Sequence, residues 1–303
     1  MDERGLLPAG VDTPADLVGR LAEVGYLADE GLATAAYLGL RLHRPLFVEG
    51  EAGVGKTELA KALGRVLDAP LIRLQCYEGI EASQALYDWD FPRQLLHLRT
   101  AEAAGVAEPD ALEAELYSRR FLISRPLLAA LETTPSVLLV DEVDRADDEF
   151  EAFLLEVLSD FAVTVPELGT IRAAVPPVVV LTSNRTRDVH DALKRRCYYH
   201  WLEHPEFDRE VAIVRLRVPE ASARLCEEVT AAAHALRGAD LLKPPGIAET
   251  VDWAQALAAL GAAGLDPGLA AATLGAVVKY REDVDRVRSL DIGALVSRAV
   301  SGV

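Results

Sequence analysis

The residues best suited to chemistry lie in one short segment, residues 50–57, which reads GEAGVGKT. Gly53 and Gly55 carry no Cβ, so the backbone there can curl and point successive N–H groups at the oxygens of an anion. A helix that begins directly after these glycines would add the partial positive charge of its N-terminus. In this arrangement Lys56 would reach the β- and γ-phosphates of a nucleotide, and the Thr57 hydroxyl would bind Mg²⁺. The pattern G-x-x-x-x-G-K-[ST] therefore predicts a phosphate-binding loop for ATP.

The flanking residues match the structure that such a loop requires. Residues 45–49, PLFVE, form a short apolar run that is typical of a buried strand. After the loop, apolar residues recur every three or four positions between Leu59 and Leu67, which predicts a helix. Strand, loop and helix in this order favour the motif over a chance match to a glycine-rich turn. The residues expected to contact the nucleotide in this segment are Gly50, Glu51, Ala52, Gly53, Val54, Gly55, Lys56, Thr57 and Glu58.

A second segment suited to chemistry is residues 137–142, VLLVDE. Four consecutive apolar residues fit a strand that is covered on both faces, and an acidic pair follows at its carboxyl end. Open α/β sheets bind their ligands at this end of their strands. Asp141 would hold Mg²⁺ through its water shell, and Glu142 would orient or deprotonate the water that attacks the γ-phosphate. Downstream of a phosphate-binding loop, this pattern predicts a hydrolytic site.

Two further polar positions could complete such a site. Asn184 follows the buried strand expected at residues 178–182, where its amide could hold the attacking water; a turn-forming asparagine is the alternative. Arg195 and Arg196 lie on a short expected helix. They fit either surface charge or an arginine finger that is delivered to the γ-phosphate of a neighbouring subunit.

Other residues near these motifs have weaker assignments. Tyr26 and Leu27 lie in a mostly helical region ahead of the loop and are candidate contacts to the adenine ring, although core packing explains them equally well. Several acids follow Glu142 and precede a helix with a clear apolar face. Because the helix dipole favours acids near a helix N-terminus, most of them need no catalytic role. These acids are Asp144, Asp147, Asp148, Glu149 and Glu151.

The order of the expected elements divides the chain near Pro205, where strand patterns end and only helical patterns follow. Residues 1–204 are expected to form an α/β nucleotide-binding domain, and residues 205–303 a smaller all-helical domain. The first domain contains a mostly helical insertion at about residues 93–131 and a hairpin with a glycine turn at about residues 163–175. The helical patterns of the second domain cover residues 207–217, 221–237, 248–260, 268–280 and 292–300.

The composition narrows the possible functions. Among 303 residues, 31 are basic and 48 are acidic, and the net charge of −17 argues against a nucleic acid substrate. Three cysteines are too few for a disulfide framework, which fits a reducing compartment. His200 and His204 are four residues apart, but the sequence between them does not match a zinc protease, and they are expected to end a strand.

The same composition bears on location. No apolar run is long enough to span a bilayer. The first residues, MDERGLLPAG, lack the basic and then apolar pattern of a signal peptide. The sequence therefore predicts a soluble, cytoplasmic protein without a membrane span.

Taken together, the phosphate loop, the Asp-Glu strand, the asparagine at the next strand tip, the arginine pair and the helical C-terminal part resemble the AAA+ ATPases. Residues 50–57 and 137–142, with the helical insertion and the hairpin, are similar to the MoxR family. More narrowly, residues 73–79 (RLQCYEG), 87–90 (YDWD) and 93–96 (RQLL) resemble the MoxR-type ATPases encoded beside carbon monoxide dehydrogenase genes. The resemblance covers nearly the whole chain.

This resemblance implies an AAA+ core with a parallel five-stranded sheet flanked by helices, and a smaller all-α lid. It implies a chaperone driven by Mg²⁺ and ATP that assembles as a ring, a hexamer. The ring would work with a partner bearing a von Willebrand factor A domain, on a metalloenzyme or another complex awaiting maturation. Arg195 or Arg196 would complete the active site of the adjacent protomer, and the spacing after Leu193 favours Arg195.

One position departs from the family pattern. Family members often carry a lid arginine that contacts the nucleotide, whereas residues 246–253 here read GIAETVDW, and Glu249 stands about where that arginine would be. A carboxylate there would repel the γ-phosphate unless it faces away. A nucleotide-dependent binding switch with little hydrolysis is therefore an alternative function. A DNA-directed AAA+ motor is a further alternative, supported by shared architecture alone.

Overall fold

The computed structural model describes residues 6–105, 109–290, 293–294 and 296–297. The chain divides into two compact units. The first comprises Met1–Arg20, Glu30–Glu49 and Ala60–His200. The second comprises Leu21–Asp29, Gly50–Leu59 and Trp201–Val303. The second unit therefore combines three segments that are far apart in the sequence.

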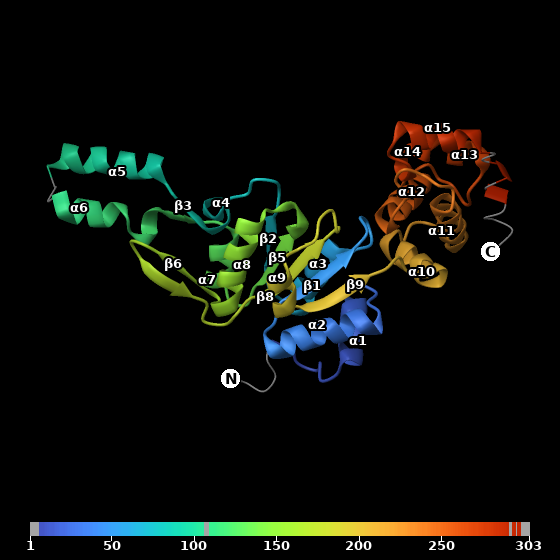
Figure 1. Ribbon diagram of the computed structural model, residues 1–303. Coiled ribbons are helices and arrows are strands. Elements are labelled where there is room, and N and C mark those ends of the chain that lie inside the picture. The colour runs from blue at the N-terminus through green and yellow to red at the C-terminus, as the bar shows by residue number, and fades with distance from the viewer. Residues whose placement is uncertain (1–5, 106–108, 291–292, 295, 298–303) are drawn as a thin grey trace. The chain divides into compact units, whose positions relative to one another are not determined.

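The first unit is built on a five-stranded sheet with the strand order β2-β5-β8-β1-β9 (Figure 1). Its strands are β1 (Leu46–Gly50), β2 (Leu71–Gln75), β5 (Val137–Asp141), β8 (Val178–Ser183) and β9 (Tyr198–Leu202). Every residue of β1 and β5 is buried, as expected for parallel strands with helices on both faces. The parallel sheet and its flanking helices confirm the α/β fold expected from the sequence.

The register of the sheet decides which side chains meet at its functional edge. Parallel pairing places Gln75 beside Asp141 and Glu49 beside Ser183. Because β1, β5 and β8 run in the same direction, their carboxyl ends lie along one edge. The residues that follow these three strands are therefore the ones that the fold can bring together.

Helices cover the sheet and are held by the apolar side chains they bury. They are α1 (Pro14–Glu23), α2 (Glu30–Leu42), α3 (Lys56–Val66), α4 (Ala82–Leu86), α7 (Pro126–Glu132), α8 (Asp148–Asp160) and α9 (Asp191–Arg196), with 3₁₀ turns at Arg119–Phe121 and Val143–Arg145. Leu128 and Leu154 are fully buried in one cluster with Leu138 and Val140 of β5. Burying a side chain of this kind stabilises the fold by about 1.5–3 kcal/mol. α8 begins at Asp147, whose side chain accepts the Phe150 N–H at 2.8 Å.

The region between β2 and β5 contains a feature that the sequence did not predict. β3 (Tyr87–Trp89) pairs antiparallel with β4 (Leu122–Ser124), and this pair carries α5 (Phe91–Ala104) and α6 (Pro109–Leu116). The two helices lie side by side in Figure 1, and Gln94 Nε2 donates to the Leu116 carbonyl at 2.6 Å. Further along, β6 (Ala162–Val165) and β7 (Gly169–Arg172) form an antiparallel hairpin.

The described part of the chain after β9 is helical, in agreement with the expected helical C-terminal region. It contains α10 (Phe207–Arg217), α11 (Ala223–Arg237), α12 (Ile247–Ala259), α13 (Pro267–Ala272), α14 (Leu274–Val277) and α15 (Arg281–Ser289). The helix expected over residues 268–280 is divided at Thr273, whose hydroxyl accepts the indole N–H of the buried Trp253 at 2.7 Å. The helix expected over residues 292–300 lies largely outside the described residues. None of the helices in the described ranges is long and apolar enough to cross a bilayer.

An ionic cluster is buried among these helices. Glu210 of α10 is fully buried and accepts two hydrogen bonds of 2.6 Å from Arg237, one of 2.8 Å from His234 and one of 2.9 Å from the Thr250 hydroxyl. Burial alone would raise the pKa of Glu210, but these hydrogen bonds and the Arg237 charge outweigh it and lower the pKa to about 2. Glu210 therefore joins α10, α11 and α12 as a charged group.

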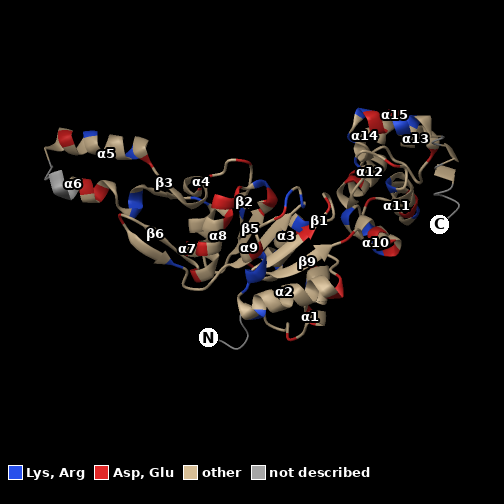
Figure 2. Ribbon diagram, in the orientation of Figure 1, with Lys and Arg blue, Asp and Glu red and all other residues tan. Residues whose placement is uncertain are grey.

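Surface charges of both signs alternate along the same helices. Figure 2 shows Lys and Arg segments among Asp and Glu segments on α10, α11 and α15. Some of them pair, as Arg286 does with Asp240 at 2.8 Å. Pairs between exposed side chains of this kind contribute about 0–1 kcal/mol each. The buried cluster around Glu210 therefore stabilises the second unit more than such a surface pair does.

Candidate active site

The predicted phosphate-binding loop connects β1 to α3. Gly53 has a φ angle of +81° and Gly55 one of +103°, a backbone region that glycine adopts at little cost. Because α3 begins at Lys56, the N–H groups of its first turn, which no carbonyl oxygen of the helix itself can accept, are at the end of the loop. Lys56 is buried, and its Nζ donates to two carbonyl oxygens of the loop at 2.8 and 2.6 Å. The ammonium group is thus held at the loop, as an anion-binding role requires.

The other predicted loop residues have distinct surroundings. Val54 is buried in the loop, and Thr57 is the second residue of α3. Glu51 Oε2 lies 3.0 Å from His204 Nε2, and Glu58 Oε2 lies 3.2 Å from Arg217. The first contact is a hydrogen bond and the second an ion pair; both are partly exposed, so each contributes about 1 kcal/mol or less. These contacts connect the loop and the first turn of α3 to residues that follow β9 within the second unit.

The segment that carries the candidate adenine contacts belongs to the same unit as the loop. The ring edge of Tyr26 lies 4.0 Å from the position that a Cβ on Gly55 would take. Desolvation, with the nearby charge of Asp29, raises the pKa of Tyr26, so the phenol stays neutral. Arg209 of α10 donates to the Leu27 carbonyl at 2.7 Å. Tyr26 therefore lies beside the loop, whereas the backbone of Leu27 is held by α10, and their contact with the base stays a prediction.

The first turn of α12 lies against the loop. The Ala248 N–H donates to the Gly53 carbonyl at 3.3 Å. Glu249 Oε2 accepts the Gly246 N–H at 3.0 Å, so its carboxylate caps the N-terminus of its own helix. The same oxygen lies 3.0 Å from the position of a Cβ on Gly53. Glu249, which stands at the expected arginine position, therefore hydrogen-bonds to the backbone at the start of its own helix.

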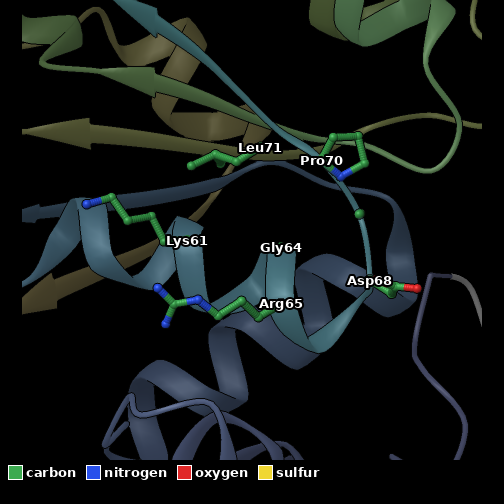
Figure 3. A pocket seen from close by; sticks show the side chains of 7 residues that line it. Lys61, Gly64, Arg65, Asp68, Pro70 and Leu71 are labelled. Carbon is green, nitrogen blue, oxygen red and sulfur yellow. The ribbon is translucent and has the colours of Figure 1, made fainter.

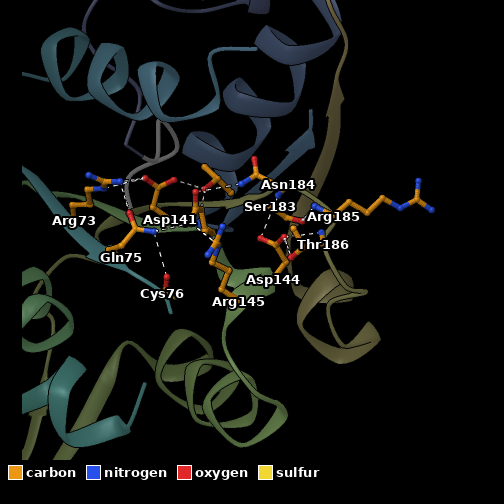
Figure 4. Close-up of polar contacts among 12 residues, drawn as sticks. Arg73, Gln75, Cys76, Asp141, Asp144, Arg145, Ser183, Asn184, Arg185 and Thr186 are labelled. Carbon is orange, nitrogen blue, oxygen red and sulfur yellow. Dashed lines mark hydrogen bonds and ion pairs between the residues drawn. The ribbon is translucent and has the colours of Figure 1, made fainter. Parts of the chain in front are cut away.

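Asp141, the predicted Mg²⁺ residue, ends β5 and is buried. Its Oδ2 accepts hydrogen bonds from Arg73 Nε at 2.9 Å and Nη2 at 2.6 Å, and its Oδ1 accepts the Thr182 hydroxyl at 2.5 Å (Figure 4). The carboxylate thus already pairs with a cation, the Arg73 guanidinium. A hard ion such as Mg²⁺ prefers carboxylate oxygens, so Asp141 fits a Mg²⁺ site in which the ion takes the place of the guanidinium.

Glu142, the predicted catalytic acid-base residue, has a φ angle of +55°. A non-glycine residue in this region costs about 1–3 kcal/mol, and such strain clusters at functional sites. The conformation is held by the Glu142 N–H, which donates to the Thr182 hydroxyl at 2.9 Å. The carboxylate accepts Gln75 Nε2 at 3.2 Å and Arg145 Nε at 2.9 Å on Oε2. Asn184 Nδ2 donates to Oε1 at 3.3 Å, so the structure brings Glu142 and Asn184 together.

Asp144 contributes to this site in a way that its sequence position did not indicate. The sequence placed it with acids that favour a helix N-terminus, whereas Asp147 is the residue that caps α8. Asp144 is buried and accepts the N–H groups of Asn184 at 3.2 Å and Thr186 at 2.8 Å (Figure 4). It therefore fixes the segment that carries Asn184. The one sequence feature that could have indicated this role is the position of Asp144, two residues after the expected Asp-Glu pair.

Arg195 and Arg196 occupy the last turn of α9, and both side chains are exposed. Their carbonyl oxygens accept hydrogen bonds from Arg44, at 2.7 Å for Arg195 and 3.2 Å for Arg196. Arg44 also lies over the ring of Tyr198 at 5.2 Å. The end of α9 is therefore fixed while its two arginine side chains face outward, which suits either surface charge or a contact with another subunit.

An open hollow of about 570 Å³ lies elsewhere in the first unit (Figure 3). It is lined by Lys61, Gly64 and Arg65 of α3 and by residues 68–71, which lead into β2. The hollow is at the opposite end of α3 from Lys56. It is therefore separate from the phosphate-binding loop, and its shallow shape does not identify a ligand.

Comparison with known proteins agrees with this arrangement of fold and motifs. Residues 45–197, just over half of the chain, match the family model described as AAA domain (dynein-related subfamily). The chain belongs to this family of AAA domains. A comparison with curated proteins finds no match.

Similar solved structures include Thermotoga maritima RuvB, described as a Holliday junction branch migration motor. It is 15% identical, with a TM-score of 0.44, and the match covers 89% of this chain and 72% of RuvB. A mutant of the same RuvB is 14% identical, with a TM-score of 0.47, and the match covers 88% of this chain and 72% of that one. These likenesses are too weak to carry a functional conclusion.

Proposed function

We propose that the chain is a Mg²⁺-dependent ATP hydrolase in which residues 50–57 bind the phosphates and Glu142 acts on the attacking water. The observation that carries the proposal is the 3.3 Å contact between Asn184 Nδ2 and Glu142 Oε1. Asn184 directly follows β8 and Glu142 directly follows β5, and β8 is the neighbour of β1, which leads into the loop. An amide and a carboxylate that meet in this way can both bind the same water.

Each residue has a defined task in this proposal. Lys56 and the loop N–H groups bind the β- and γ-phosphates. Thr57 and Asp141 would hold Mg²⁺, which would neutralise phosphate charge. Glu142 orients the water and accepts its proton, and Asn184 fixes the water from the other side. Tyr26 and Leu27 contact the adenine ring.

The pairing of Arg73 with Asp141 leads to a measurable prediction about Mg²⁺. Arg73→Gln should lower the Mg²⁺ concentration at which a fluorescent ATP analogue reaches half-maximal binding, because the metal no longer competes with the guanidinium. Arg73 is half exposed, so the pair contributes about 1 kcal/mol or less, and the expected shift is about two- to fivefold. Arg73→Lys keeps the charge and should remain near wild type. Equal Mg²⁺ midpoints in wild type and Arg73→Gln would contradict the competition.

The finer proposal is a MoxR-type ATPase that acts as a chaperone or remodelling factor. Its support is the resemblance of residues 73–79, 87–90 and 93–96 to the MoxR-type ATPases encoded beside carbon monoxide dehydrogenase genes. On this proposal the protein is cytoplasmic and forms a hexameric ring. It works with a partner that bears a von Willebrand factor A domain, and its client is a metalloenzyme or another complex in maturation. The net charge of −17 favours a protein client over nucleic acid.

The ring is tested by steady-state ATP hydrolysis over a range of protein concentration. The specific rate of the wild type should rise with concentration, because each site needs an arginine from its neighbour. Arg195→Ala should lower the rate at high concentration by about 10³-fold, in line with the contribution of arginine fingers. Lys194→Ala, on the same helix, is the matched control and should keep the wild-type rate. A concentration-independent rate that survives Arg195→Ala would rule out a shared site.

A nucleotide-dependent binding switch is the second candidate, and Glu249 favours it. Its carboxylate occupies the first turn of α12 beside Gly53, where family members carry a lid arginine. A negligible hydrolysis rate at every concentration, together with ATP binding, would support the switch over the hydrolase.

A further inference from the structure

A buried acid lies at the base of the phosphate-binding loop. Glu49 is the residue directly before Gly50 and is almost fully buried at the end of β1. Its Oε1 accepts the Ser183 hydroxyl at 2.9 Å, and its Oε2 accepts the Tyr199 hydroxyl at 3.0 Å. Burying a carboxylate is costly unless its oxygens are hydrogen-bonded, so both hydroxyl groups support Glu49 where it stands. The sequence had indicated only a position in an apolar strand.

Ser183 also contacts the backbone of Arg185, the residue after Asn184. Ser183 Oγ accepts the Arg185 N–H at 2.9 Å. A serine hydroxyl has a single proton, and Ser183 donates this proton to Glu49. Glu49 thereby orients the hydroxyl so that its free lone pairs face Arg185. Arg185 has a φ angle of +57°, a strained conformation that persists only where the surroundings hold it.

Asp144 holds the same segment from the other side. It accepts the Asn184 N–H at 3.2 Å, the Thr186 N–H at 2.8 Å and the Thr186 hydroxyl at 2.7 Å. Residues 183–186 are therefore fixed between two buried carboxylates. The Asn184 side chain leaves this segment and reaches Glu142 at 3.3 Å.

We propose that Glu49 is a positioning residue that acts through Ser183 to hold Asn184 against Glu142. Because Glu49 precedes the phosphate-binding loop, it joins the base of that loop to the groups that handle the attacking water. This role rests on the proposed ATP hydrolysis. It makes Glu49 important for turnover rather than for nucleotide affinity, since its two carboxylate oxygens are engaged by the hydroxyl groups of Ser183 and Tyr199.

Two matched variants test the inference, because each removes one hydroxyl from the same carboxylate. Ser183→Ala removes the contact that leads to Asn184, whereas Tyr199→Phe removes the contact that leads to β9 and keeps the ring. Hydrogen exchange of peptides covering residues 183–189 is the first readout. In Ser183→Ala the amides of Asn184 and Thr186 should exchange faster along with that of Arg185, although their acceptor Asp144 is intact. In Tyr199→Phe the exchange of this segment should match wild type.

Kinetics provide the second readout. Ser183→Ala should lower kcat by about tenfold, with KM for ATP and nucleotide affinity within about twofold of wild type, as loss of orientation predicts. Tyr199→Phe should leave kcat unchanged. In an Asn184→Ala background, Ser183→Ala should cause no further loss, because both changes disable the same contact.

The outcomes separate this inference from the proposed function. Unchanged exchange at Asn184 and Thr186 in Ser183→Ala overturns the positioning role, whatever the hydrolysis rate. Equal losses of kcat in Ser183→Ala and Tyr199→Phe also overturn it, because they would indicate a general effect on the fold. Normal hydrolysis in Asn184→Ala, or none in the wild type under any condition, would instead overturn the proposed hydrolytic site and the catalytic part of the inference with it.

Discussion

Glu142→Gln should reduce the rate of ATP hydrolysis by about 10²–10⁴-fold while ATP remains bound. The amide keeps the size of the side chain, and its single oxygen can still accept the hydrogen bond from Asn184. It cannot accept a proton from the attacking water, so the chemical step loses its base. The measurement is single-turnover hydrolysis of radiolabelled ATP at saturating Mg²⁺, with nucleotide affinity determined on the same preparation.

Glu149→Gln is the matched control for this variant. Glu149 is an exposed acid in the first turn of α8, only seven residues further along the chain. It should hydrolyse ATP at the wild-type rate. If Glu142→Gln also retains that rate, the contact between Glu142 and Asn184 does not position the attacking water, and the proposed hydrolytic site is wrong.

Glu210→Ala should lower the free energy of unfolding of the second unit by about 3–5 kcal/mol. The substitution leaves Arg237, itself mostly buried, without the carboxylate that accepts both of its 2.6 Å hydrogen bonds. It also removes the acceptor that His234 and Thr250 share. Denaturant unfolding followed by circular dichroism measures the loss. Glu227→Ala, which breaks the partly exposed pair with Arg215, should cost about 1 kcal/mol or less.

The pH dependence of this difference follows from the lowered pKa of Glu210. Its pKa falls from an ordinary value of 4.5 to about 2 in the folded chain, so folding favours the charged form. The stabilisation is therefore fully present above about pH 4.5 and is lost as the pH falls toward about 2. The stability gap between wild type and Glu210→Ala should narrow over this range. A gap that stays constant down to pH 2 would show that the charge of Glu210 does not contribute.

The sequence was sufficient to predict those parts of the candidate site whose residues are close together in the chain. The glycines, lysine and threonine of residues 50–57 lie within eight consecutive positions, so their spacing alone predicts the loop. The four apolar residues before Asp141 likewise predict a buried strand, and the fold places Asp141 and Glu142 at its carboxyl end. The α/β fold followed from the alternation of such strands with helical patterns.

The sequence was insufficient to predict contacts between side chains that are distant in the chain. Arg73 and Asp141 are 68 positions apart, and Glu49 and Ser183 are 134 apart, so only the parallel register of the sheet brings them together. α15 was missed because its sequence is mostly charged, and its helix depends on the few apolar side chains that it buries, such as Val287. β3 and β4 are three residues each, too short for an alternating pattern to stand out.

The fixed end of α9 has a consequence for the proposed ring. Arg44 binds the carbonyl oxygens of Arg195 and Arg196, and the Pro45 carbonyl accepts the Tyr198 N–H at 2.8 Å. These contacts attach the outward-facing arginines to the residues that open β1, the strand that leads to the phosphate-binding loop of the same protomer. A shift of β1 when a nucleotide arrives would therefore move the arginines as well. In a ring, each protomer would report its own nucleotide state to its neighbour through the position of these two side chains.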